Sequence, residues 1–365
     1  MTIRRPHPTR TLGSTRARRS GVLAAAAALL AAALTGCGSD ATGNEAAIRD
    51  DGTVDLAKVT LIVGDQKGGS RALLQAAGLL DDIPYDITWE EFTSGPPLLE
   101  AMNANALHVG GVGNTPPIFS AAGGSEFKVV QAATYGGLGD ALVVQQDSPL
   151  RTVADLEGKT VAVAPGSSAN YNLLAQLQAA GLSYDDITVK SLQPADALTA
   201  FSGGSIDAWA IWEPFTSQAE QDAGARVLAD GSTLMNGYTF QVASDVALED
   251  PATSAALEDY LSRIAQAQAW SATHKEEWAK VWAAETGLPE SITVAAVAKR
   301  TIETLPIDST IIDSEQQMAD AFADAGLIPE KVDMSGFFDD RFNDATTGTG
   351  AGTASTTTTS GGAAS

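Results

Sequence analysis

Three short loops carry residues that could bind a small anion. They are Asp65–Ser70 (DQKGGS), Thr93–Pro97 (TSGPP) and Pro165–Asn170 (PGSSAN), and each separates an apolar run from a helical pattern. Glycine lets the backbone approach a ligand, and serine or threonine caps the next helix while N–H groups still point outward. Helix starts of this kind bind anions, and Lys67 adds a positive charge nearby. These loops predict a site for a small anionic ligand.

The third loop gives the sharpest hypothesis. An apolar strand, then Pro-Gly-Ser-Ser, then an amphipathic helix aims backbone N–H groups and the positive end of a helix at one point. We therefore expect Gly166 and the hydroxyl groups of Ser167 and Ser168 to hold the anionic head of the ligand. The alternative is that Ser167 is only a helix N-cap, which would affect stability and leave affinity unchanged.

Catalytic motifs are missing from the sequence. HExxH, GxSxG and a glycine-rich phosphate motif do not occur, and His108 and His274 are expected to have structural roles. Glu213 could act as a general base, but no motif places a second carboxylate beside it. Cys37 is the only cysteine, so a cysteine metal site or thiol nucleophile in the fold is excluded. We expect no enzyme activity, no cofactor and no metal.

Short apolar runs alternate with helical patterns and predict an α/β fold with largely parallel sheets. The expected strands are 59–63, 85–90, 107–112, 128–132, 141–145, 160–164, 187–191, 206–211 and 238–243. From Pro251 to about Ala325 the pattern is mostly helical.

An internal repeat predicts two lobes of similar topology. The segment Ala72–Trp89 recurs at Ala175–Val189, with QAAGL in both copies, and Pro96–Ala101 has a rough counterpart at Pro194–Ala200. Equivalent strands then end at the same places in each lobe, and ligands of open α/β sheets bind outside the carboxyl ends of strands. This predicts a cleft lined by Asn114 and Thr115 from one lobe and by Trp212 and Glu213 from the other, with Trp209 in the core.

The amino-terminal segment resembles a secretory signal that ends in a lipobox. Six arginines precede an apolar run, and LTGC places Cys37 where a lipidated first residue would lie. Removing the six arginines changes the net charge from −23 to −29, which argues against nucleic acid or an anionic membrane surface as a partner. The sequence does not distinguish between export by the Sec pathway and export by the Tat pathway. We expect a secreted protein held at the outer face of the membrane by its lipid alone.

These observations divide the chain into segments. We expect a signal peptide (1–36), a flexible lipid-anchored linker (37–57), lobe 1 (58–142 and 238–342), lobe 2 (143–237) and a disordered tail (343–365).

Several separated motifs together are similar to one family of proteins. They are DQKGG, SGPPLLEAMNAN, GVGNTPPIF, VADLEGKTVAVAPGSSANYNLLAQLQAAGL, DAWAIWEPF and AETGLPESITVAAVAKR. The chain resembles the substrate-binding proteins of ABC importers for aliphatic sulfonates, within the nitrate, sulfonate and taurine group. The resemblance implies a two-lobed periplasmic-binding-protein fold (type II), with hinge strands at GDALVVQ and YTFQVAS. It also implies a monomer that closes on its ligand and docks on a membrane permease.

The resemblance also implies which residues surround the cleft. They are Gln66, Ser94, Gly95, Asn114, Thr115, Ser167, Ser168, Trp212 and Glu213. Asp65 and Asn114 depart from the family pattern, which often has an aromatic residue and an acid there, so the ligand itself stays open. Nitrate, taurine or a heterocyclic precursor is the alternative ligand. An enzyme of the sulfinate desulfinase type is a further alternative, but such enzymes use a cysteine nucleophile.

Overall fold

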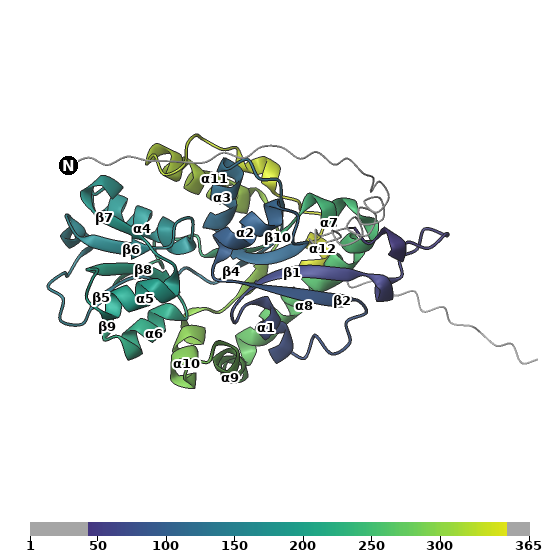
Figure 1. Ribbon diagram of the computed structural model, residues 1–365, viewed down its shortest axis with the longest axis horizontal. Coiled ribbons are helices and arrows are strands. Elements are labelled where there is room, and N and C mark those ends of the chain that lie inside the picture. Colours follow the sequence, from purple (N-terminus) through teal and green to yellow (C-terminus); the bar gives the residue numbers. More distant parts are fainter. Residues whose placement is uncertain (1–42, 349–365) are drawn as a thin grey trace, which may run out of the picture. The chain divides into compact units, whose positions relative to one another are not determined.

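The computed structural model describes residues 43–348, which contain two β-sheets with helices packed on them (Figure 1). The first sheet has six strands in the order β11-β4-β10-β3-β1-β2. They are β1 (Thr60–Gln66), β2 (Asp86–Phe92), β3 (Val109–Gly113), β4 (Lys128–Thr134), β10 (Tyr238–Ala243) and β11 (Glu303–Leu305). Strands β1, β2 and β3 are parallel, whereas β10 is antiparallel to both β3 and β4. We call this sheet and its helices lobe 1.

The second sheet has five strands in the order β7-β6-β8-β5-β9. They are β5 (Asp140–Gln145), β6 (Thr160–Val163), β7 (Thr188–Ser191), β8 (Ala208–Trp212) and β9 (Ala225–Asp230). Strands β6, β7 and β8 are parallel, and β5 is antiparallel to β8 and β9. The five strands follow the same pattern as β2-β1-β3-β10-β4 of lobe 1. This sheet and its helices form lobe 2.

The chain crosses between the lobes twice. Each crossing leads into the antiparallel strand of the other sheet, β5 after the first and β10 after the second. The crossing segments, 135–139 and 231–237, touch each other, since the Tyr135 N–H donates to the Gly237 carbonyl oxygen over 2.9 Å. Gly237 has a φ of 65°, and a Cβ atom there would lie 2.5 Å from the Gly137 nitrogen. Only glycine fits so close an approach.

Helices cover both sheets. Lobe 1 has α1 (Ser70–Ala76), α2 (Gly95–Asn103) and α3 (Thr115–Ala122), and lobe 2 has α4 (Ser168–Ala179), α5 (Pro194–Ser202) and α6 (Phe215–Asp222). The carboxyl-terminal part adds α7 (Asp245–Glu249), α8 (Pro251–Thr273), α9 (Lys275–Thr286), α10 (Glu290–Lys299), α11 (Ser309–Asp324) and α12 (Asn343–Thr347). Across residues 43–348, none of the helices has both the length and the apolar character needed to span a bilayer.

Each lobe has its own apolar core. In lobe 1, Leu61 of β1 belongs to the same buried cluster as Leu257 and Tyr260 of α8. In lobe 2, Trp209 is fully buried, with its ring centroid 6.1 Å from that of Phe201. The expectation that Trp209 is a core residue is confirmed.

Two strands and the boundary of lobe 2 differ from the sequence predictions. The missed strands are β9, an edge strand in which only Ala225 is buried, and β11, which has three residues. Neither shows the alternation of buried and exposed side chains that identifies a strand in sequence. The predicted boundary at 142/143 falls inside β5, so residues 140–142 belong to the second sheet.

The prediction of a flexible linker is wrong for residues 43–57, the part of the linker that the structure describes. The Asn44 side chain accepts from the Thr60 N–H (3.0 Å) and donates to the Thr60 carbonyl (3.2 Å), as a neighbouring strand would. Ala47 is 1% exposed and belongs to the lobe 1 core. The segment is therefore packed on the fold, through contacts that composition cannot reveal.

The predicted tail also begins too early. Residues 343–347 form α12, where the Asn343 side chain accepts from the Ile307 N–H and donates to the Ile307 carbonyl. The signal segment, Cys37 and residues 349–365 lie outside the described residues.

Candidate functional site

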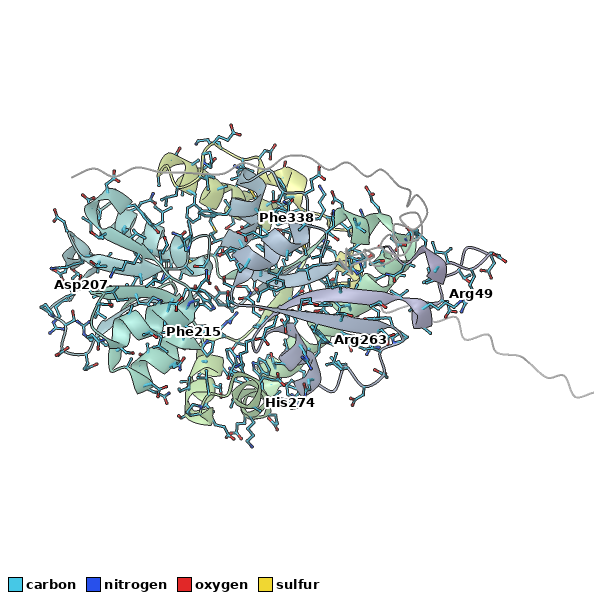
Figure 2. The ribbon with its side chains drawn as sticks, viewed as in Figure 1. Arg49, Asp207, Phe215, Arg263, His274 and Phe338 are labelled. Carbon is cyan, nitrogen blue, oxygen red and sulfur yellow. The ribbon has the colours of Figure 1, made fainter. Side chains whose placement is uncertain are left out.

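A cavity of about 620 Å³ is lined by residues from both lobes. Strands β1 and β8 reach it with their carboxyl ends, at Gln66 and Trp212, which is where open α/β sheets bind ligands. Its volume lies within the range of small-molecule sites. Phe215, labelled in Figure 2, begins α6 and packs edge-on against Trp212, with ring centroids 6.2 Å apart. Together these features place the candidate site where the repeat predicts it.

Seven of the predicted site residues line this cavity. They are Gln66, Lys67, Gly95, Ser167, Ser168, Trp212 and Glu213. All seven lie at strand ends or helix starts, as the loop pattern predicts.

Four predicted site residues do not line the cavity. Asn114 is fully buried, and its amide donates to the Asn236 Oδ1 atom over 2.6 Å, while the Thr115 hydroxyl donates to Asn114. The Ser94 hydroxyl donates to Gln193 of lobe 2 over 3.0 Å. Gly166 turns the chain with a φ of 70° beside the Phe119 ring. Ser94 and Asn114 thus contact segments about a hundred or more positions away in the chain, so their sequence neighbours could not reveal these roles.

The serine hydroxyls at the start of α4 are already engaged. The Ser167 hydroxyl donates to the Ala164 carbonyl and accepts from the Asn170 N–H, which makes Ser167 the N-cap of α4. The Ser168 hydroxyl donates to the Asp140 carboxylate over 2.6 Å. The hypothesis that both hydroxyls hold an anion therefore needs correction. The start of this twelve-residue helix still provides the positive dipole end that favours an anion.

Asp140 and Arg300 lie beside that helix start. Asp140 is fully buried and accepts from Ser168 and from the Tyr135 hydroxyl. Burial raises the pKa of the Asp140 carboxyl, although those two hydroxyls and the Arg300 charge act in the opposite direction. The guanidinium carbon of Arg300 lies 4.6 Å from the centre of the Tyr135 ring, and the Nε atom has no hydrogen-bond partner within residues 43–348. Arg300 is thus a cation at the cavity with unused donor capacity.

Glu213 is an ion-pair partner within the fold. Its carboxylate is 2.9 Å from Lys299 Nζ, and it accepts from the backbone N–H and the hydroxyl of Ser217. Lys299 also pairs with Glu220 at 2.8 Å. Burial lowers the pKa of Lys299, but hydrogen bonds and the charges of Glu220 and Glu213 outweigh it, so this pKa is above its usual value. The arrangement ties α10 to α6 and engages the Glu213 carboxylate within the fold.

The lobe 1 side of the cavity has a different chemistry. Asp65 is 8% exposed, and its carboxylate accepts from the N–H groups of Ser70 and Arg71. Burial raises the pKa of the Asp65 carboxyl to about 6, although these N–H groups act in the opposite direction. Trp278 and Trp282 are stacked with ring centroids 5.4 Å apart, and both line the cavity.

Several cavity residues were missed by the sequence analysis. Tyr135 lies in the first crossing segment, Asp140 begins β5 and Arg300 follows α10. Gln241 lies on β10, and Trp278 and Trp282 lie on α9. The pair of tryptophans four residues apart is the one signal that could have been found. Neither of the two histidines among residues 43–348 lines the cavity, and His108 is buried and accepts from the Ile62 N–H at Nδ1.

Comparisons with known proteins give consistent results. The family model described as the NMT1-like family matches residues 62–284. An Escherichia coli protein named as an aliphatic sulfonates-binding protein is 35% identical over 278 residues, which cover 75% of this chain and 86% of that protein. The alkanesulfonate-binding protein of Xanthomonas axonopodis pv. citri, solved bound to MOPS, is 33% identical with a TM-score of 0.71. That alignment covers 79% of this chain and 99% of the other.

A desulfurization enzyme is also similar in structure, with 16% identity, a TM-score of 0.58 and coverage of 80% of this chain and 99% of its own. At that identity the likeness shows the fold alone, whereas the relatives above 30% identity are named as binding proteins. The expected resemblance and the two-lobed fold are confirmed. The chain belongs to the NMT1-like family, with the periplasmic-binding-protein fold of its sulfonate-binding relatives.

Proposed function

We propose that the chain is a non-catalytic receptor outside the cytoplasm that binds an aliphatic sulfonate and delivers it to an ABC importer. The observation that carries the proposal is the meeting of Arg300 and the α4 helix start at one cavity between two lobes. A guanidinium group and the positive end of a helix both stabilise an anion. The relatives named for sulfonate or alkanesulfonate binding support this choice of anion. The protein acts as a monomer that closes on its ligand and docks on the permease.

A thermal-shift screen tests the ligand class. Alkanesulfonates at about 100 times their dissociation constant should add about 2.7 kcal/mol to the free energy of unfolding and raise the melting temperature. Sulfate, nitrate and heterocyclic precursors are compared at equal ionic strength, with chloride as the control. Stabilisation by nitrate or a heterocycle, with none by any sulfonate, would contradict the proposal.

The membrane anchor is a separate part of the proposal. Cys37 follows LTG and is the only cysteine, which supports lipidation at that position after export. Cys37→Ala should move the protein from the membrane fraction to the soluble fraction of cells, since one lipid-bearing residue carries the attachment. Unchanged membrane partitioning of the variant after signal removal would show that another segment holds the protein there.

A further inference from the structure

The two lobes meet at a side-chain hydrogen bond that lies outside the crossing segments. The Ser94 hydroxyl of lobe 1 donates to the Gln193 Oε1 atom of lobe 2 over 3.0 Å, and the Thr93 hydroxyl donates to the same atom over 3.4 Å. Thr93 and Gln193 line the cavity, whereas Ser94 is fully buried and does not line it. The bond therefore joins the two walls of the cavity at its border.

The local sequence leaves the Ser94 hydroxyl free for this contact. A serine that precedes a helix normally accepts from the N–H group of the second or third helical residue. Helix α2 begins Gly95-Pro96-Pro97, so both of those positions are prolines, which have no N–H group. Ser94 makes no capping bond to α2, and the Gln193 side chain makes none to α5. The two side chains bond to each other in place of their own helices.

The sheet topology places this bond far from the crossing segments. Ser94 follows β2 and Gln193 follows β7, and both strands lie at the edges of their sheets. The crossing segments join β4 to β5 and β9 to β10. Two strands separate β2 from β10, and two separate β7 from β5. A rotation of the lobes about the crossing segments moves these edges furthest apart, so we expect the bond to break whenever the lobes separate.

We propose that Ser94 and Gln193 are positioning residues that form a latch between the lobes and slow the release of the ligand. Thr93 provides a second, longer bond to the same acceptor. A ligand in a closed cleft leaves only after the lobes separate, so a contact that breaks on opening lowers the dissociation rate. This inference rests on the proposed function because it needs lobes that close on a ligand, but it does not depend on which sulfonate is bound.

The competing interpretation is a static contact that only stabilises the fold. Asn114 shows that such a role exists in this chain. It also precedes a helix with prolines at its second and third positions, and its amide bonds to Asn236 in the second crossing segment. Loss of a static contact would lower the melting temperature and leave ligand release unchanged. Measurements of release and stability on the same variants therefore separate the two interpretations.

The experiment measures release of butane-1-sulfonate from Ser94→Ala by stopped-flow tryptophan fluorescence. The dissociation rate constant should rise about 3- to 10-fold, which corresponds to the loss of one hydrogen bond. The melting temperature of the ligand-free variant should stay almost unchanged, because each lobe keeps its own core when the latch is absent. Since Ser94 does not line the cavity, a lost contact with the ligand cannot explain faster release.

Ser244→Ala is the matched control. Ser244 is 2% exposed and lies outside the cavity, and its hydroxyl caps α7 by accepting from the Ala247 N–H. This variant should have a lower melting temperature and an unchanged dissociation rate, because its hydroxyl serves the fold of lobe 1 alone.

A double-mutant cycle assigns the effect to the latch. Gln193→Ala should also speed release, although part of its effect can come from lost contact with the ligand, because Gln193 lines the cavity. Adding Ser94→Ala to Gln193→Ala should then change the rate by less than about twofold, since the bond is already absent.

The outcomes separate the latch from the proposed function. If Ser94→Ala releases the sulfonate at the unmodified rate, or speeds release equally with and without Gln193, the latch is overturned and the receptor proposal stands. If no alkanesulfonate binds the unmodified protein, the proposed function fails, and small-angle X-ray scattering of the ligand-free protein decides on the latch. The variant with both Ser94→Ala and Gln193→Ala should then have a larger radius of gyration than Ser244→Ala, and equal radii would overturn the latch.

Discussion

Lys299→Met is expected to lower the free energy of unfolding by about 3 kcal/mol. The substitution leaves the Glu213 carboxylate, whose side chain is fully buried, without the ammonium group 2.9 Å away. Removing one partner of a buried ion pair strands a charge in a medium that solvates it poorly, at a cost of roughly 3–5 kcal/mol. The lower end applies here because Ser217 still donates two hydrogen bonds to Glu213. Urea unfolding of the ligand-free protein measures the change.

Two further variants make this test specific. Lys331 also pairs with two acids, Asp320 and Asp324, but its side chain is 60% exposed, so Lys331→Met should leave stability almost unchanged. Adding Glu213→Gln to Lys299→Met removes the stranded charge and should restore part of the loss. A Lys299→Met protein as stable as the unmodified chain would mean that water reaches Glu213 and that the pair does not hold α10 to α6.

The interaction between Lys299 and Glu213 also shows where sequence reasoning stops. The positions of Trp209, Trp212 and Glu213 follow from the apolar strand that precedes them, because a buried strand has a recognisable pattern and its end is predictable. The partner of Glu213 lies 86 positions away on α10, and no local pattern in the sequence points to it. Strand ends could therefore be predicted, whereas the contacts made by their side chains could not.

The same distinction explains the serine residues and Asn114. PGSSAN correctly predicts a capped helix start at the cavity, because capping depends on neighbouring residues. The hydroxyl of Ser168 nevertheless bonds to Asp140 at the start of β5, and Asn114 bonds to Asn236 in the second crossing segment, through contacts between residues far apart in the sequence. Arg300 was missed for the same reason, since it follows a helix that the repeat does not include.

The correction at Ser168 changes which experiments are informative. A carboxylate at position 168 would lie against the buried Asp140 carboxylate, so Ser168→Asp would disturb the fold through two adjacent acids as well as the ligand site. Substitution of Arg300 is a cleaner test of anion binding, because it directly removes the charge that is proposed to contact the ligand.

Arg300→Met is therefore expected to weaken binding of an alkanesulfonate by about 100-fold. Two hydrogen bonds from a guanidinium group to a sulfonate are together worth roughly 3 kcal/mol. Methionine keeps an apolar chain at this position but loses the guanidinium group that lies over the Tyr135 ring. Arg300→Lys should lose about tenfold, since it keeps the charge but not the planar pair of donors. Calorimetry measures the affinities, and thermal melting of the ligand-free variants reports the separate effect on the fold.

Arg226→Met provides the matched control for Arg300→Met. Arg226 has a buried Nε atom without a hydrogen-bond partner in the described part of the chain, as Arg300 does, but it lies on β9 and bonds to the carbonyl oxygens of Ser148 and Leu150. It does not line the cavity, so this variant should lose stability and keep its affinity. The alternative role for Arg300 is to offset the Asp140 charge alone. That role would give Arg300→Met a lower melting temperature with undiminished sulfonate affinity, and such a result would remove Arg300 from the binding site.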